Sequence, residues 1–337
     1  MPLSTPDAEA YPDLPAARDR WILERRGARA FVDPSRPVGC FLEEELTETG
    51  AMEPVLTVLI ANRECPWRCL MCDLWRSTTE QSVPPGAVAA QVRDALSAFP
   101  EARRAKLYNA GSFFDPHAIA PEDLPEIVRA VRGLDRVVVE CHPALVGDAC
   151  RRFADDIGGR LEVAMGLETV HPEALASLNK RMTADDFRRA ADRLSSWRIP
   201  FRAFVLLGAP RLPAAEAVAW TGRSVEFAFD CGATAVTIIP TRAGNGALDA
   251  LERRGEFTPP ALEDLEVALA LALGIRQVRG RVRVFADLWD LDRLRKCGAC
   301  FPRRRDRLAG MNRTQTVPPG DSPGSRDFCG SCGHGGA

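Results

Sequence analysis

The stretch 55–75 reads VLTVLIANRECPWRCLMCDLW, and the interpretation of the whole chain depends on it. Residues 55–61 form a short apolar run that predicts a buried β-strand. The polar segment that follows contains Cys65, Cys69 and Cys72, with three residues between the first two cysteines and two between the last two. Three cysteines in one short loop after a strand indicate a metal centre, because thiolates are strong ligands for iron and zinc.

The spacing of these cysteines favours an iron–sulfur cluster. Three thiolates hold three irons of a [4Fe–4S] cube and leave the fourth iron open to a small ligand. A structural zinc site normally has four ligands, and the nearest downstream histidine is His117. Three ordinary core cysteines are the remaining alternative, since a free Cys packs as a small apolar side chain.

Between residues 55 and 242 apolar strands alternate with amphipathic helices, which is typical of a parallel β/α fold. We count six units, with strands at 55–61, 105–110, 136–141, 161–167, 201–207 and 233–240. A complete eight-unit barrel takes about 250 residues, so the pattern predicts an α/β fold of the partial (β/α)6 TIM-type barrel class. A flavodoxin-like doubly wound sheet is the alternative, but it does not account for the cysteine loop.

Composition divides the chain into three expected regions. These are an N-terminal extension at 1–50, the (β/α)6 core at 51–275, and a small basic, Cys-rich C-terminal extension at 276–337. Within residues 276–313 twelve Lys and Arg stand against four Asp, in a chain whose net charge is −2. This local excess predicts either a surface that binds RNA or a solvated Arg-rich surface.

The C-terminal extension carries two Cys-x2-Cys pairs, Cys297 with Cys300 and Cys329 with Cys332. Four thiolates in two such pairs are typical of a tetrahedral zinc site whose metal stabilises a small fold. An auxiliary iron–sulfur cluster uses the same ligands. The extension is therefore predicted to bind zinc or a second cluster.

The loop with Cys65, Cys69 and Cys72 resembles the signature of the radical S-adenosylmethionine (SAM) superfamily, in particular its elongator-subunit and methylthiotransferase members. The resemblance implies that the amino and carboxylate groups of SAM bind the open iron, and that reductive cleavage of SAM yields a 5′-deoxyadenosyl radical. It also implies a partial barrel. Met71 stands where the family often has an aromatic residue, and the resemblance places it beside the cofactor.

A closer resemblance is to the radical SAM group that includes the archaeosine synthase radical subunit, which acts on a modified base in tRNA. The segments that carry it are 62–75, 106–116, 161–183 and 201–210. The shared residues are mostly those that serve SAM and the cluster. The resemblance therefore assigns the substrate only by analogy, because the similarity lies in the fold and the cofactor site.

In a barrel of parallel strands, chemistry gathers at the carboxyl ends of the strands. The resemblance places the segment that binds the SAM amino group at the end of the second expected strand, at Asn109, Ala110, Gly111 and Ser112. It places Glu168, after the fourth strand, in contact with the SAM ribose or amine. A salt bridge from Glu168 to Lys180 or Arg181 is the structural alternative.

Three further side chains at strand ends are the candidate catalytic residues. Cys141 and His142 end the third expected strand, where they can donate a hydrogen atom or a proton to the substrate. Alternation along the strand equally allows Cys141 to lie in the core. Arg242 follows the sixth strand and can bind a carboxylate or phosphate in a bidentate manner, or be solvated.

No apolar run reaches the roughly 20 residues that span a bilayer, and residues 1–20 lack a signal-peptide core. We therefore expect a cytoplasmic protein with reduced cysteines and no membrane partner. The expected function is a radical SAM enzyme that abstracts hydrogen from an undetermined substrate. One hypothesis is a modified tRNA nucleobase, and the alternative is a small metabolite or natural-product intermediate. A non-catalytic iron–sulfur or zinc sensor is the third hypothesis. The resemblance implies an electron donor that is flavodoxin- or ferredoxin-like.

Overall fold

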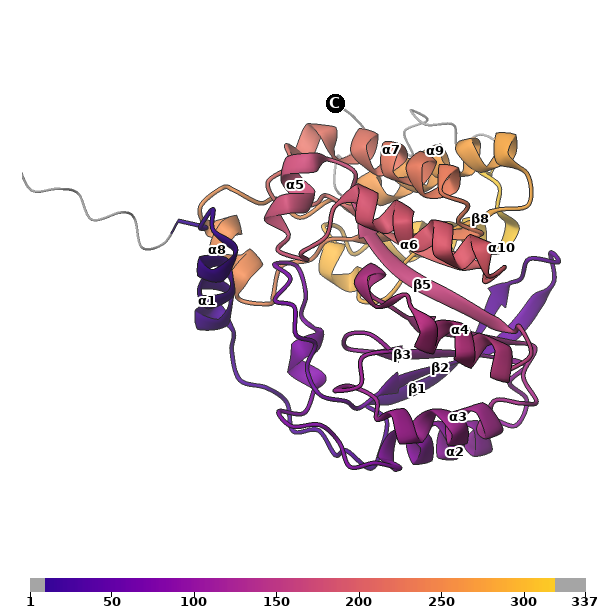
Figure 1. Ribbon diagram of the computed structural model, residues 1–337. Helices are drawn as coiled ribbons and strands as arrows, with labels where there is room; N and C mark the ends of the chain where they lie inside the picture. The colour runs from indigo at the N-terminus through magenta and orange to yellow at the C-terminus, as the bar shows by residue number, and fades with distance from the viewer. Residues whose placement is uncertain (1–9, 319–337) are drawn as a thin grey trace, which may run out of the picture.

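The computed structural model describes residues 10–318 and arranges their strands in one eight-stranded sheet, in the order β1-β2-β3-β4-β5-β6-β7-β8 (Figure 1). The first two strands, β1 (Gly39–Leu46) and β2 (Met52–Ile60), pair antiparallel. All later neighbours pair parallel, namely β2 with β3 (Arg104–Asn109), then β4 (Arg136–Glu140), β5 (Leu161–Glu168), β6 (Phe201–Leu207), β7 (Ala235–Pro240) and β8 (Arg283–Ala286).

The predicted partial barrel is confirmed. Strands β2 to β7 are the six that the sequence pattern predicts, and the sheet curls without β8 pairing to β1 among the described residues. Two strands were not expected. β1 has the sequence GCFLEEEL and β8 is only four residues long, so neither shows the apolar run of a buried parallel strand.

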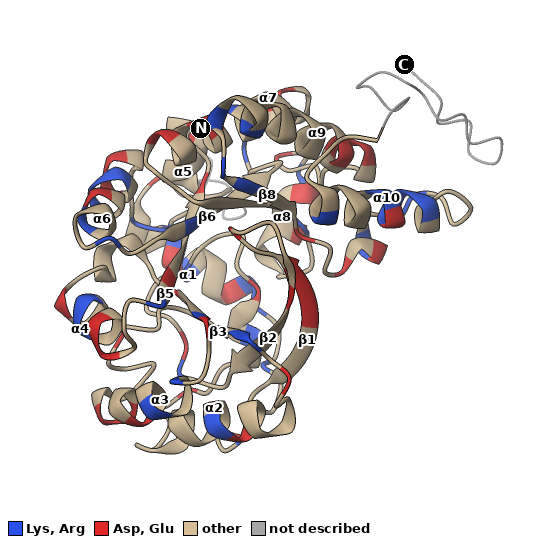
Figure 2. Ribbon diagram, turned by 90° about the vertical axis from the view of Figure 1, so that its right-hand side faces the viewer, with Lys and Arg blue, Asp and Glu red and all other residues tan. Residues whose placement is uncertain are grey.

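Helices cover the convex face of the sheet (Figure 2). The covering helices are α2 (Ala87–Ala98), α3 (Leu124–Ala130), α4 (Asp148–Asp156), α6 (Ala184–Ser196), α7 (Ala217–Asp230) and α9 (Leu262–Arg279). Their apolar sides meet alternate residues of the strands, such as Leu107, Val139 and Val163, which are fully buried in the main core. Burial of these side chains is the main source of stability. No helix in the described part of the chain is long and apolar enough to cross a membrane.

Four helices are not part of the predicted alternation: α1 (Pro15–Arg25), α5 (Pro172–Ser177), α8 (Ala247–Arg253) and α10 (Phe301–Thr314). α1 and α8 lie side by side at the edge of the barrel (Figure 1). Together they form a second small core in which Trp21, Leu248 and Phe257 pack with Leu70 of the cysteine loop. The N-terminal helix therefore contributes directly to the surroundings of the cysteines.

The amino-terminal half of the concave face is filled by ion pairs. Arg202 on β6 donates to Glu162 on β5 at 2.7 Å and to Glu45 on β1 at 2.8 Å, while Lys106 on β3 pairs with Glu45 at 2.6 Å. These side chains join strands from opposite sides of the sheet. Because the charges are buried, each depends on its partner. The network closes this end of the barrel and explains why β1 carries so many carboxylates.

The carboxyl-terminal half of the concave face is different. Here Tyr108, Glu140, Gly166, Phe204 and Thr237 are only half-buried, whereas the residues next to them in their strands are almost completely buried. The concave face is therefore accessible at the carboxyl ends of the strands, where barrel enzymes have their active sites.

Candidate functional site

The cysteine loop follows β2 and places Cys65, Cys69 and Cys72 together. All three thiols have raised pKa values because of burial: that of Cys65 is about 11, that of Cys72 about 12, and that of Cys69 lies well above the ordinary value. Cys72 and Cys65 add to the shift of the Cys69 pKa, so the three sulfurs interact. Binding of iron would release these protons, because the thiolate is the ligand.

A [4Fe–4S] cube needs a different arrangement of cysteines from a site for a single metal ion. Among residues 10–318 no three His, Cys, Asp or Glu side chains are arranged to hold a single metal ion. In a cube, however, each thiolate binds a separate iron. Three interacting thiols in one half-buried loop fit this donor set.

Asparagine side chains hold the cysteine loop from two sides. Asn245 Nδ2 donates to the carbonyl oxygen of Leu70 at 2.7 Å, and Asn179 Nδ2 donates to that of Arg68 at 2.8 Å. In addition, the Leu70 N–H donates to the carbonyl of Leu178 at 2.9 Å. Contacts of this kind orient metal ligands and are as much a part of a site as the ligands themselves. Neither asparagine was among the site residues predicted from the sequence.

Glu64, directly before Cys65, is fixed by several guanidinium groups. Arg26 donates to its Oε1 at 2.6 Å, Arg68 lies 3.2 Å from the same oxygen, and Arg29 pairs with its Oε2. Burial alone would raise the pKa of Glu64, but these arginines outweigh it and lower the pKa. Arg26 and Arg29 follow α1, so the N-terminal segment anchors the start of the loop.

Gly111 lies against the first cysteine. Its φ is +152°, and a Cβ at this position would lie 3.2 Å from Cys65 Cβ and 3.8 Å from Asn109 Nδ2. The Asn109 amide is buried, and neither its nitrogen nor its oxygen has a hydrogen-bond partner among the described residues. A ligand with both donors and acceptors would satisfy the amide. The segment predicted to bind the SAM amino group therefore contains a buried amide whose donor and acceptor are both unsatisfied.

Gly111→Ala is expected to disturb the cluster without unfolding the protein. The added methyl group meets Cys65 at a distance tighter than ordinary van der Waals contact, in a backbone conformation that favours glycine. We expect iron retention in the presence of a chelator to fall by about tenfold, as for changes beside metal ligands. Iron analysis after chelator challenge checks this, with Gly133→Ala as the control because nothing lies within 4 Å of a Cβ there. Equal iron retention in both variants would contradict the role of Gly111.

Glu168 ends β5 in a strained conformation, with φ +66° at an irregularity of the β5–β6 ladder. Its Oε1 accepts from Lys180 Nζ at 2.5 Å, and Lys180 also donates to the carbonyl of Gly166 at 2.6 Å. A Cβ at position 166 would lie 2.1 Å from both charged atoms. The ion pair that the sequence offered as the alternative therefore exists, and its carboxylate lies near Cys69. Strain of this kind is typical of functional positions.

His142 packs on the cysteine loop. Its ring stacks on Trp67 with centroids 3.8 Å apart and an interplanar angle of 10°. Nδ1 accepts from the Ala144 N–H at 3.2 Å, so Nε2 carries the hydrogen and donates to the Lys180 carbonyl at 3.1 Å. This arrangement holds neutral imidazole in place between the loop and the segment after β5.

We expect His142 to stay neutral down to about pH 4. Burial, and next the charge of Lys180, lowers its pKa from 6.5 to about 4. Below pH 6.5 the unfolded chain gains a proton that the folded chain does not, so the contribution of His142 to stability falls between pH 6.5 and pH 4. NMR titration of ring-labelled histidines in wild type and in His142→Gln checks this. Titration of the His142 resonance near pH 6.5 would contradict the assignment.

Cys141 points to the other face of the sheet. It lies in the main core with 3% exposure, and Ser112 Oγ donates to its sulfur at 3.5 Å. Ser112 also accepts from the His142 N–H at 3.2 Å, so it links two strand ends. Ala110 is half-buried. Met71 packs against the small core of α1 and α8 and also against a third cluster that contains Leu175 and Leu206. The residue of this strand that faces the concave side is Glu140, which was not among the catalytic residues predicted from the sequence.

Arg242 follows β7 and is held by Asp287 at the end of β8. Its Nη2 donates to Asp287 Oδ2 at 2.7 Å, whereas its Nε is buried and has no hydrogen-bond partner among residues 10–318. The Arg242–Asp287 pair joins the ends of the last two strands. Capture of an anionic group by Arg242 would have to compete with this carboxylate.

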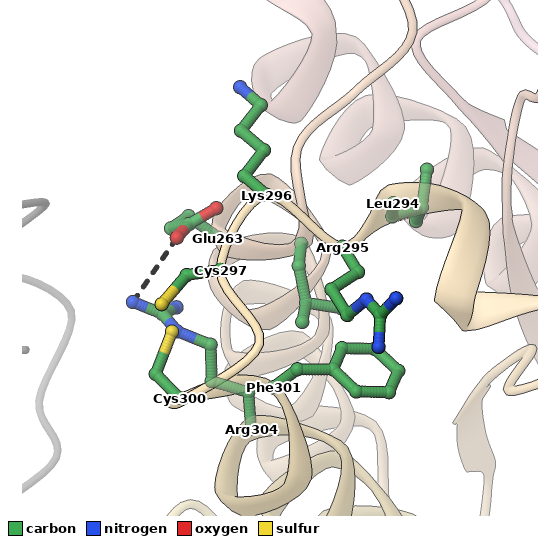
Figure 3. Close-up of a pocket in the computed structure, with 9 residues that line it drawn as sticks. Glu263, Leu294, Arg295, Lys296, Cys297, Cys300, Phe301 and Arg304 are labelled. Atoms are coloured by element: carbon green, nitrogen blue, oxygen red, sulfur yellow. Dashed lines mark ion pairs between the residues drawn. The ribbon is translucent and has the colours of Figure 1, made fainter. Parts of the chain in front are cut away.

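The first C-terminal cysteine pair lies apart from the cysteine loop. Figure 3 shows Cys297 and Cys300 with their sulfur atoms on the same side, next to Arg304. Arg304 pairs with Glu263 of α9 at 3.2 Å. Cys329 and Cys332 lie outside the described residues, so zinc or a second cluster stays a prediction.

Comparison with known proteins supports the fold. No protein-family model matches the sequence, and no curated protein matches it. The solved structure of methylornithine synthase (PylB) aligns over 90% of this chain and 89% of its own, with a TM-score of 0.50 and 11% identity. A radical SAM methyltransferase from Sphaerobacter thermophilus aligns over 75% and 77%, with a TM-score of 0.49 and 15% identity.

Other matches are longer proteins. This chain spans 51% of the Elp3 structure from Methanocaldococcus infernus, which covers 58% of this chain with a TM-score of 0.46 and 15% identity. The likeness to these structures is one of fold. The chain shares its fold with methylornithine synthase. The closer likeness to the archaeosine synthase group stays a prediction.

Proposed function

We propose that this protein is a radical SAM enzyme in which Cys65, Cys69 and Cys72 hold a [4Fe–4S] cluster whose open iron binds SAM. The observation that carries the proposal is the position of the three-thiol loop over the carboxyl ends of parallel strands, with Gly111 against Cys65. The buried Asn109 amide beside it has no partner among the described residues, which fits a bound cofactor. A sealed zinc site would not require either feature.

The residues of the chain would bind and orient SAM and shield it from water. Asn109 and Glu168 would hydrogen-bond the polar groups of SAM, and Gly111 lets the backbone come close to them. Leu70 and Trp21 cover the loop with apolar surface and exclude water. When bound, the cluster and SAM supply one-electron reductive cleavage to a 5′-deoxyadenosyl radical, so the difficult chemistry is the cofactor's. A flavodoxin- or ferredoxin-like donor would provide the electron.

For the substrate, we favour a small molecule over tRNA. Several arginines of the basic stretch are paired inside the protein: Arg279 with Asp230 at 2.6 Å, and Arg304 with Glu266 at 2.5 Å. Arg283 is buried beside Glu162. Paired charges contribute little to a field that attracts phosphates. Other basic side chains of the stretch are exposed and support the tRNA alternative: Arg281, Arg293, Arg295, Lys296, Arg303, Arg305 and Arg313.

Binding to bulk tRNA separates these substrate classes. If the substrate is small, the cluster-loaded protein should show no binding that weakens steeply as salt rises. The double variant Arg303→Gln/Arg305→Gln should then behave like wild type. Salt-dependent binding that this variant loses would favour the tRNA nucleobase instead.

The SAM site itself is tested by the EPR signal of the reduced cluster. We expect SAM to change the spectrum of the wild-type protein, because it binds directly to an iron. Glu168→Gln should raise the SAM concentration needed for half of the change by about tenfold, as expected for loss of a hydrogen bond to a charged group. Glu173→Gln is the matched control, since Glu173 is exposed on α5. A wild-type spectrum that SAM leaves unchanged would count against the proposal.

A further inference from the structure

We infer that Glu140 binds a cationic nitrogen group of the substrate, an ammonium, amidinium or guanidinium, on the concave face of the barrel. The inference rests on the proposed function and specifies the substrate class of the same site. It starts from the direction of the side chains on β4. Val139 and Cys141 belong to the core under the helices, so Glu140 between them faces the concave side.

Glu140 lies at the level where the concave face is accessible. Leu107 of β3 is aligned with Val139 of β4, so the next residues along the two strands, Tyr108 and Glu140, are neighbours. The charge of Glu140 contributes to the raised pKa of the Tyr108 hydroxyl. Both side chains are half-buried, whereas Leu107 and Val139 have 0% exposure. A ligand on the concave face could therefore reach the carboxylate.

In the described part of the chain, the other carboxyl groups of the concave face are paired with cationic side chains, but Glu140 is not. Glu45 pairs with Lys106 and Arg202, and Glu162 pairs with Arg202. Glu168 pairs with Lys180 at 2.5 Å. Among residues 10–318, by contrast, no Lys, Arg or His lies within ion-pair distance of Glu140. Carboxylates in such surroundings normally have a paired cation.

Lys180 is the strongest positive influence on Glu140, but it is already held. Its ammonium donates to Glu168 and to the carbonyl of Gly166. Burial raises the pKa of Glu140 to about 8, and Lys180 only partly opposes this shift. With this pKa the Glu140 carboxyl is mostly protonated at neutral pH while the site is empty. A cation brought by the ligand would favour the ionised form and lower the pKa of Glu140.

The ring system next to Glu140 suits such a ligand. Tyr108 and Phe204 stand edge to face with centroids 6.1 Å apart, on strands that flank the concave face from two sides. Both keep accessible surface. Aromatic rings attract cations and pack against alkyl chains, so the site favours a cationic nitrogen on an apolar stem.

The test uses simple probes and the cluster-loaded protein under anaerobic conditions. Saturation-transfer NMR would measure binding of n-butylammonium and n-butylguanidinium at about 1 mM, with neutral butanamide as the shape control. Wild type and Glu122→Gln, an exposed position, should bind the cations and prefer them to butanamide. Glu140→Gln should weaken binding of the cations by about tenfold and leave butanamide unchanged.

Glu140→Asp is the control for loss of binding through misfolding. It keeps the carboxyl group, so it should retain cation binding to within about threefold. The inference is overturned if the wild-type protein does not prefer the cations, or if Glu140→Gln binds them as well as wild type does. Failure of this inference is distinguishable from failure of the proposed function. The binding measurement requires no cleavage of SAM, whereas the proposed function fails if the intact cluster does not bind SAM or does not cleave it.

Discussion

Cys69→Ala is expected to lose the catalytic cluster and with it all cleavage of SAM. Cys69 lies in the middle of the loop, where Cys72, Cys65 and Glu168 all influence its thiol. With two thiolates left, the cube has no stable attachment, so 5′-deoxyadenosine formation should fall to below about 1% of wild type, because the cofactor supplies the chemistry. Iron and sulfide analysis with the visible absorption spectrum after anaerobic reconstitution measures the first effect.

The control for this variant is Cys231→Ala, since Cys231 is a buried cysteine at the end of α7, remote from the loop in the fold. It should retain the cluster that Cys69→Ala loses. If the C-terminal cysteines bind a second cluster, both variants keep that iron, and the difference between them reports the cysteine loop alone. Equal iron content and equal SAM cleavage in the two variants would contradict the assignment of Cys69.

Lys180→Met is expected to destabilise the protein by about 3–5 kcal/mol, because removal of one partner leaves a buried charge without compensation. Glu168 and Lys180 have side-chain exposures of 9% and 10%. Glu140 would lose the largest positive charge that acts on its carboxyl as well. The double variant Lys180→Met/Glu168→Gln should recover most of the loss, since it removes both charges.

Denaturant unfolding of the cluster-loaded proteins under anaerobic conditions measures these differences. Arg189→Met is the matched control, because its pair with Asp186 is exposed and should be worth less than about 1 kcal/mol. A loss in Lys180→Met as small as that in Arg189→Met would show that the Glu168–Lys180 pair does not stabilise the site. A loss that the double variant does not recover would assign the effect to the packing of the Lys180 stem instead.

The parallel strands could be predicted from the sequence because β2 to β7 are apolar runs separated by amphipathic helices. The antiparallel strand β1 could not. Its residues Glu43 and Glu45 are unfavourable in an isolated strand, and they are stabilised by Lys106 and Arg202, which are distant in sequence. Long-range ion pairs leave no periodic pattern. For the same reason the contacts of Arg26 and Arg29 with Glu64 were missed.

The site was predicted in part. The spacing of the cysteines and the resemblance led to Gly111 and Glu168, and the structure places both near the loop. At the end of β4 the pattern allowed either Cys141 or its neighbours to face the ligand. Deciding between them requires knowing that the helices pack on the Cys141 side, which makes Glu140 the residue of the concave face. Side-chain alternation gives two faces but does not identify which one is open.

Reductive cleavage of SAM is measured by anaerobic incubation of the reconstituted wild-type protein with SAM and a strong reductant, followed by quantification of 5′-deoxyadenosine. The wild-type protein should form 5′-deoxyadenosine, and Cys69→Ala should form none above background. Wild-type protein with an intact cluster, bound SAM and no 5′-deoxyadenosine would contradict the proposed function.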